Sequence, residues 1–157
     1  MNTKFTTLLT GLVMMSLLFG CKEDPPASAA YEGSYTTTHE VLNPAPMLKQ
    51  RITGISPGKP LNISKFVAIS TVNATTPPPF KVSGDGTFYT DNGDVFTTTF
   101  TGTSTPNADG TSAVEMTHTI VGGTGKFAKA SGTFVGAARA NLRLATGTIT
   151  YKGTITY

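Results

Sequence analysis

From Tyr31 to Tyr157, apolar and polar positions alternate with a period of two, and short clusters of Gly, Pro, Asn and Asp interrupt the alternation. This pattern is typical of strands with one buried face, and no stretch of useful length has helical periodicity. The Asn92-Gly93 pair favours a tight hairpin turn. We predict eight strands, at residues 31–40, 48–55, 62–74, 80–90 with a kink at 84–86, 95–104, 112–121, 131–144 and 148–157.

Evenly spaced strands joined by short turns indicate an all-β sandwich or a closed barrel. The strand at 131–144 shows its two faces clearly, because Arg139 and Arg143 lie opposite the apolar side and a slip of one residue would bury them. The apolar side carries Phe134, Gly136, Ala138, Ala140, Leu142 and Leu144. Small residues on the apolar faces are expected to leave space for large neighbours or for a ligand. They are Gly33, Ala138, Ala140 and Gly153.

A second architecture stays open, because alternating strands that end in an aromatic residue, here Tyr157, also describe transmembrane barrels. In such a barrel the apolar face meets lipid. The apolar face of this chain is rich in Gly and Ala, and aromatic girdles are not evident. These observations favour a barrel with its rings inside and with Arg139 and Arg143 outside.

The N-terminal segment has a cation, Lys4, followed by an apolar stretch at 8–19 that is too short to span a bilayer as a helix. It ends in Leu18-Phe19-Gly20-Cys21, which resembles the lipobox of bacterial lipoproteins. The resemblance implies cleavage before Cys21 and a lipid on its sulfur; the alternative is an ordinary buried cysteine. We therefore divide the chain into a lipoprotein signal peptide (1–20), a lipidated tether (21–30) and a β-barrel domain (31–157).

This division also predicts the protein's location. Two acyl chains give stable membrane anchoring, so Cys21 is expected to hold the protein in the cell envelope, on the outer membrane. The following Lys22, Glu23 and Asp24 resemble a surface-export signal of some Gram-negative lipoproteins, and a solvated tether is the equal alternative.

Composition narrows the chemistry of the domain. Charged residues are only 13% of the 157 residues and no basic cluster is present, so a nucleic-acid partner is not supported. Cys21 is the single cysteine, which leaves no disulfide for the mature part. Asp85, Asp91 and Asp94 lie near turns and lack EF-hand spacing, and no zinc-ligand spacing is found. We predict no metal and no cofactor.

One Gly-rich motif lies between two predicted strands, at 121–132 (VGGTGKFAKASG). It follows a strand, but neither a helix nor a Lys-Ser/Thr pair follows it, so a phosphate-binding loop is disfavoured. The motif resembles the GGTGxF segment of the dirigent and allene oxide cyclase-like barrels, and the last hairpin resembles theirs as well. The resemblance implies an eight-stranded antiparallel barrel with an apolar cavity, in which Phe127 plugs the core. It implies no catalytic residue in this chain, because none of the family's acids and arginines matches a position here.

The candidate ligand-binding residues are those on the more apolar face of each strand, and we expect them to point inward. They are Tyr35, His39, Phe96, Phe100, Met116, His118, Phe134 and Tyr151. His39 and His118 are the only side chains of a type that titrates near neutral pH. Each is either a polar group that contacts a ligand or a core histidine whose hydrogen bonds are satisfied.

The leading functional hypothesis is a barrel that binds a small hydrophobic molecule without catalysis. An isomerase or cyclase of the allene oxide cyclase type and a structural or adhesive surface module are the alternatives. Whether the barrel forms oligomers stays open.

Overall fold

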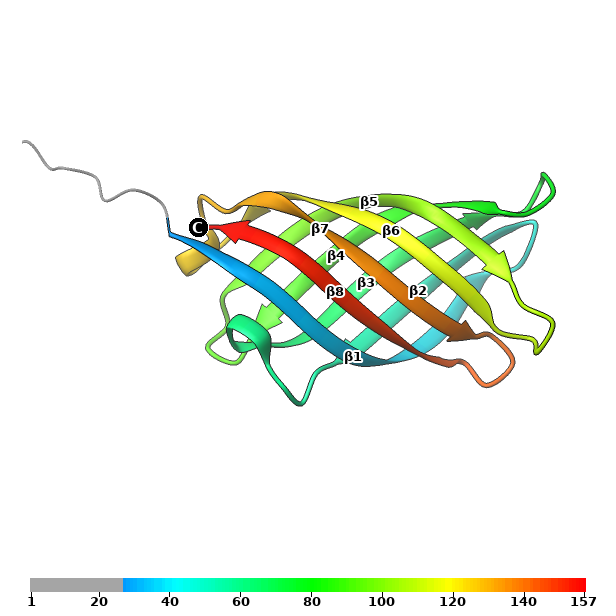
Figure 1. The fold of residues 1–157 in the computed structure, drawn as a ribbon, viewed down its shortest axis with the longest axis horizontal. Coiled ribbons are helices and arrows are strands. Elements are labelled where there is room, and N and C mark those ends of the chain that lie inside the picture. The colour runs from blue at the N-terminus through cyan, green and yellow to red at the C-terminus, as the bar shows by residue number, and fades with distance from the viewer. Residues whose placement is uncertain (1–26) are drawn as a thin grey trace, which may run out of the picture.

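The computed structural model describes residues 27–157, which form eight antiparallel strands closed into a barrel (Figure 1). The strands are β1 (Ser28–Asn43), β2 (Met47–Ile55), β3 (Ile63–Asn73), β4 (Phe80–Thr90), β5 (Val95–Pro106), β6 (Ser112–Gly123), β7 (Ser131–Asn141) and β8 (Thr146–Thr156). Two short 3₁₀ turns, η1 (Pro60–Asn62) and η2 (Gly125–Phe127), lie between strands. Each strand pairs with its neighbours in sequence, and β8 pairs back with β1. The predicted eight-stranded antiparallel barrel is therefore confirmed, while the segments predicted as a signal peptide (1–20) and most of the predicted tether (21–30) lie outside the described residues.

β1 starts earlier than predicted, and β4 lacks the predicted kink. β1 begins at Ser28, because Ser28 to Ala30 pair with Thr156 to Thr154 of β8. β4 runs from Lys81 to Tyr89 in unbroken register with β5, so the expected kink at 84–86 does not interrupt the pairing. Closure of the barrel gives both strands a partner on each side, and this tertiary pairing overrides the local effect of glycine.

The turn after β7 corrects the prediction for two leucines. β7 ends at Asn141, whose side-chain Oδ1 accepts a hydrogen bond of 3.0 Å from the backbone N–H of Leu144. Ala145 has a left-handed backbone (φ 54°), which completes the reversal of the chain. Leu142 and Leu144 are therefore 44% and 66% exposed in the turn at the end of the barrel and do not lie on the strand; Leu142 contributes to the mouth of the cavity described below.

The strands place their rings inside and their polar residues outside. The buried aromatic side chains are Tyr31, Tyr35, Phe66, Phe88, Phe96, Phe100, Phe127, Phe134 and Tyr151. The outer faces carry threonines and charged residues, and Arg139 and Arg143 are exposed as expected for the arrangement with the rings inside. In the described part of the chain, no helix has the length and apolar character needed to cross a membrane.

The interior has two halves along the barrel axis. Figure 1 shows the start of β1, the end of β8, η1 and η2 at one end, and the β1–β2, β3–β4, β5–β6 and β7–β8 turns at the other. We call the first the closed half and the second the open half. The closed half is filled by Tyr31, Tyr35, Ile63, Phe88, Phe96, Phe127, Phe134 and Ile155, which are all buried. Its rings pack edge to face or stacked, for example Phe88 on Phe96 with centroids 4.7 Å apart.

Candidate functional site: a cavity in the open half

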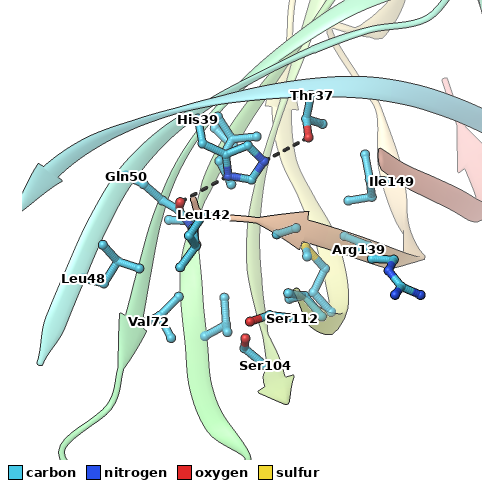
Figure 2. Close-up of a pocket in the computed structure, with 18 of the residues that line it drawn as sticks. Thr37, His39, Leu48, Gln50, Val72, Ser104, Ser112, Arg139, Leu142 and Ile149 are labelled. Atoms are coloured by element: carbon cyan, nitrogen blue, oxygen red, sulfur yellow. Dashed lines mark hydrogen bonds between the residues drawn. The ribbon is translucent and has the colours of Figure 1, made fainter. Parts of the chain in front are cut away.

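The open half contains a cavity of about 190 Å³ (Figure 2). Its lining comes from all eight strands and from the turns at the open end. Apolar side chains dominate, including Leu48, Ile52, Ala68, Val72, Phe80, Val82, Val114, Met116, Ala138, Ala140 and Ile149. A smaller polar set comprises Thr37, His39, Gln50, Ser70, Ser104, Ser112 and Thr148. An apolar cavity with a few polar groups is the usual form of a small-molecule site.

Four rings separate the cavity from the closed half and form its floor. Phe66, Phe100, His118 and Tyr151 line the cavity. They also contact one another, with centroid distances of 4.7 Å for Phe100–His118 and 5.1 Å for His118–Tyr151. On the far side, His118 stacks on Phe134 at 4.8 Å. The floor is therefore braced by the packed rings below it.

The structure divides the eight predicted site residues into two groups. His39, Phe100, Met116, His118 and Tyr151 line the cavity. Tyr35, Phe96 and Phe134 point inward as expected, but they are buried in the closed half and are not among the cavity-lining residues. Alternation tells which face of a strand is buried, whereas the height of a residue along the barrel axis depends on the stagger between strands.

The small residues expected to leave space behave in two ways. Ala138 and Ala140 line the cavity. Gly33 instead faces Pro60, whose Cγ lies 2.5 Å from where a Cβ would be, and Gly153 is covered by Phe134 in the same manner. In the closed half, glycine thus allows a neighbouring ring to pack against the backbone, and it leaves no free space.

His118 is the most enclosed polar side chain at the cavity floor. It is 1% exposed, and its Nδ1 lies 3.0 Å from the hydroxyl of Thr98. Its Nε2 has no hydrogen-bond partner. Among the described residues, it is the only fully enclosed side-chain nitrogen or oxygen atom without one. Burial among rings lowers the pKa of His118 to about 3, so the imidazole is neutral at physiological pH.

His39 belongs to a hydrogen-bonded chain on the cavity wall, which Figure 2 shows with dashed lines. Its Nε2 lies 2.9 Å from Thr37 Oγ1, and its Nδ1 lies 3.2 Å from Gln50 Oε1. Burial lowers the pKa of His39, and the bond to Gln50 partly opposes this effect. The imidazole is therefore neutral, and its hydrogen bond to Oε1 fixes the position of the Gln50 amide. Sequence reasoning missed Gln50, although it shares the buried face of β2 with Leu48 and Ile52.

The mouth of the cavity combines one ion pair with exposed apolar residues. The guanidinium of Arg139 donates to the carboxylate of Asp109, and both side chains are more than half exposed. Figure 2 shows the end of the Arg139 side chain directed away from the other lining residues. The exposed large apolar residues at this end are Val41, Leu42, Met47, Leu142 and Leu144.

The Gly-rich motif lies at the opposite end and closes the barrel there. Gly125 in η2 has φ of 55°, and Phe127 is fully buried against Phe96 and Tyr157, with centroid distances of 5.2 and 5.1 Å. Asp94 accepts a hydrogen bond of 3.4 Å from the backbone N–H of Lys126. The motif thus contributes a core plug and contacts none of the cavity.

In comparisons with known proteins, no family model and no curated protein matches this chain.

Proposed function

We propose that this barrel binds a small, mainly hydrophobic molecule in the cavity of its open half. The observation that carries the proposal is the asymmetry of the interior: one half is packed with rings, and the other keeps about 190 Å³ of largely apolar space. A cavity of about 150 Å³ lined by apolar residues takes benzene, so this one has room for a one-ring compound with a short substituent. Its polar groups give a bound molecule an orientation.

Binding of an environment-sensitive hydrophobic dye to the barrel domain tests the proposal. Ala138→Trp places a large ring in the cavity and is expected to weaken dye binding at least tenfold, because the ring occupies the binding volume. Ala137→Trp is the matched control, since Ala137 is exposed on the outer face of the same strand. If the two variants bind the dye equally well, the cavity is not the site.

Kinship with the dirigent and allene oxide cyclase-like barrels is part of the same proposal. The closed eight-stranded barrel, the buried Phe127 in the GGTGKF motif and the apolar cavity support it. The cyclase alternative needs a group that exchanges protons with a ligand, and no observation favours it over binding alone. The surface-module alternative requires a cavity filled by its own side chains.

We also propose that Cys21 carries a lipid that anchors the barrel in the cell envelope. The lipobox-like sequence supports this proposal, and β1 begins only seven residues after Cys21, so the tether is short. Cys21→Ser is expected to abolish incorporation of a labelled fatty acid and to move the protein from the membrane to the soluble fraction. Ser28→Ala, which keeps the cysteine, is the control. Labelling that persists in the Cys21→Ser protein would contradict the anchor.

A further inference from the structure

The hydrogen bonds around Gln50 have a fixed direction. Gln50 Oε1 only accepts, so the Nδ1 of His39 must carry the hydrogen and donate to it. The neutral imidazole then has a bare Nε2, which accepts from the hydroxyl of Thr37. The chain runs from Thr37 through His39 to Gln50, and it uses the acceptor end of the Gln50 amide.

The donor end of that amide is left without a protein partner. Gln50 is only 5% exposed, yet its Nε2 forms no hydrogen bond within the described residues. Since His118 Nε2 is the only fully enclosed side-chain atom there without a partner, the Gln50 amide nitrogen reaches the cavity space. A buried N–H group costs free energy unless an acceptor meets it, and here the acceptor has to come from the cavity.

A second polar group lies next to this nitrogen. Ser70 of β3 is the direct register partner of Gln50 of β2, and both side chains line the cavity. Directly paired residues have Cβ atoms about 5 Å apart. The Ser70 hydroxyl has no hydrogen-bond partner among the described residues either, and the residue is 2% exposed. The amide nitrogen of Gln50 only donates, whereas the Ser70 hydroxyl donates or accepts, so one oxygen atom between them can take both hydrogen bonds.

The charges around the cavity exclude an ionised group at this position. Among the described residues that line the cavity, Arg139 alone has a permanent charge, and it is exposed at the mouth and paired with Asp109. His39 and His118 are neutral because burial lowers the pKa of each ring. A carboxylate in the cavity would be buried without a cation, which is costly.

We propose that the ligand is an uncharged carbonyl compound, a ketone or ester with a mainly hydrocarbon body, whose oxygen accepts from the Gln50 amide and the Ser70 hydroxyl. This inference rests on the proposed ligand-binding function and adds the chemical class of the ligand. A carbonyl oxygen has two lone pairs and no hydrogen of its own. It can therefore accept one hydrogen bond from each of the two donors, and both of its lone pairs are used. The remaining lining is apolar and takes the hydrocarbon body.

Four probes of similar size test the inference by calorimetric titration of the barrel domain: acetophenone, 1-phenylethanol, ethylbenzene and benzoate. Acetophenone is expected to bind about 3- to 10-fold more tightly than ethylbenzene, the effect of one or two net hydrogen bonds. The alcohol is expected to lie between them, because its hydroxyl hydrogen needs a further acceptor. Benzoate is expected to bind least.

Gln50→Met keeps the length of the side chain and removes the donor. It is expected to lower the preference for acetophenone over ethylbenzene by at least about twofold, because only the Ser70 hydroxyl then remains as a donor, while ethylbenzene binding stays within about twofold. Lys49→Met is the matched control, because it places the same side chain on the exposed outer face of the same strand, β2, and it is expected to keep the preference. Acetophenone labelled with carbon-13 at the carbonyl gives a second readout. Its bound resonance is expected near the value in water in the wild-type protein and upfield of that, toward the hydrocarbon-solvent value, in Gln50→Met, provided the variant melts cooperatively.

The outcomes separate the two proposals. Equal binding of acetophenone and ethylbenzene by the wild-type protein, or a ketone preference that is undiminished in Gln50→Met, overturns the carbonyl assignment and leaves the binding function intact. If none of the neutral probes binds, both the binding function and the carbonyl assignment are overturned. Tightest binding by benzoate contradicts the assignment of an uncharged ligand.

Discussion

The two halves of this barrel are built by the same eight strands, yet only one of them is filled. β7 illustrates the difference, because it contributes Phe134 to the closed half and Ala138 and Ala140 to the open half. β3 does the same, with Ile63 in the closed half and Ala68 and Ser70 in the open half. In these two strands the inward side chains become smaller toward the open half while the pairing continues. The strand pairing therefore supplies the wall, and the closed half supplies a rigid floor for a cavity that stays open.

The largest difference between the halves is expected for removal of a ring. Phe88 is fully buried and contacts the rings of Tyr31, Phe66, Phe96, His118, Phe134 and Tyr151. Phe88→Ala is expected to lower the free energy of unfolding by about 3–5 kcal/mol. Phe80→Ala, at the half-buried edge of the cavity, should cost less than about 2 kcal/mol. Urea melts of both variants measure the difference, and equal losses would mean that the two halves are equally packed.

The second expected effect is a dependence of stability on pH that comes from His118. Its pKa is about 3 in the folded protein and about 6.5 in the unfolded chain, so between these values the unfolded chain binds the extra proton. Stability therefore falls as the pH is lowered from 6.5 towards 3. From pH 7 to pH 4 the loss from this residue is roughly 3 kcal/mol. His118→Phe is expected to flatten the profile measured by urea melts at a series of pH values, and an unchanged profile would assign the dependence to other groups.

A smaller effect is expected at two neighbouring glycines at the closed end. A Cβ at Gly123 would overlap the backbone oxygen of Phe127 and lie 2.7 Å from that of Val95. At Gly122 the nearest atom is the Thr97 hydroxyl oxygen at 3.7 Å, an ordinary contact. Gly123→Ala is expected to cost about 1–3 kcal/mol and Gly122→Ala less than about 0.5 kcal/mol. Thermal melts of the pair decide whether the motif has the structural role assigned to it; similar midpoints would count against that role.

The smallest change in stability is expected in the open half. Ala138→Val adds two methyl groups next to free space and places a β-branched residue in a strand, which favours the strand. Its free energy of unfolding is expected to stay within about 0.5 kcal/mol of the wild-type value. A loss above 2 kcal/mol in denaturant melts would show that the cavity is already tightly packed around Ala138.

The sequence alone predicted the strands well, because alternation and turn residues are local properties of the chain. The two misplaced leucines, Leu142 and Leu144, follow Asn141, whose side chain begins the turn earlier than the apolar pattern suggests. The site was predicted less completely. His118 and Tyr151 were found by their face, but nothing local distinguishes the height of Phe134 from that of Ala138. Gln50 could not be recognised as a site residue from its own strand, because its role depends on a hydrogen bond to His39 of β1.

The first and last described residues lie side by side at the closed end, where the backbone N–H of Tyr157 donates to the carbonyl oxygen of Ala27 over 2.7 Å. β1 and β8 are already paired along their length, so the order of strands around the barrel has no break at the chain ends. The same ring of paired strands could therefore be formed by a chain that starts at a different strand. A circular permutant that joins 157 to 27 through a short Gly-Ser linker and opens the β5–β6 turn at Asp109 would keep every strand pair, and it would bring the new ends to the mouth of the cavity.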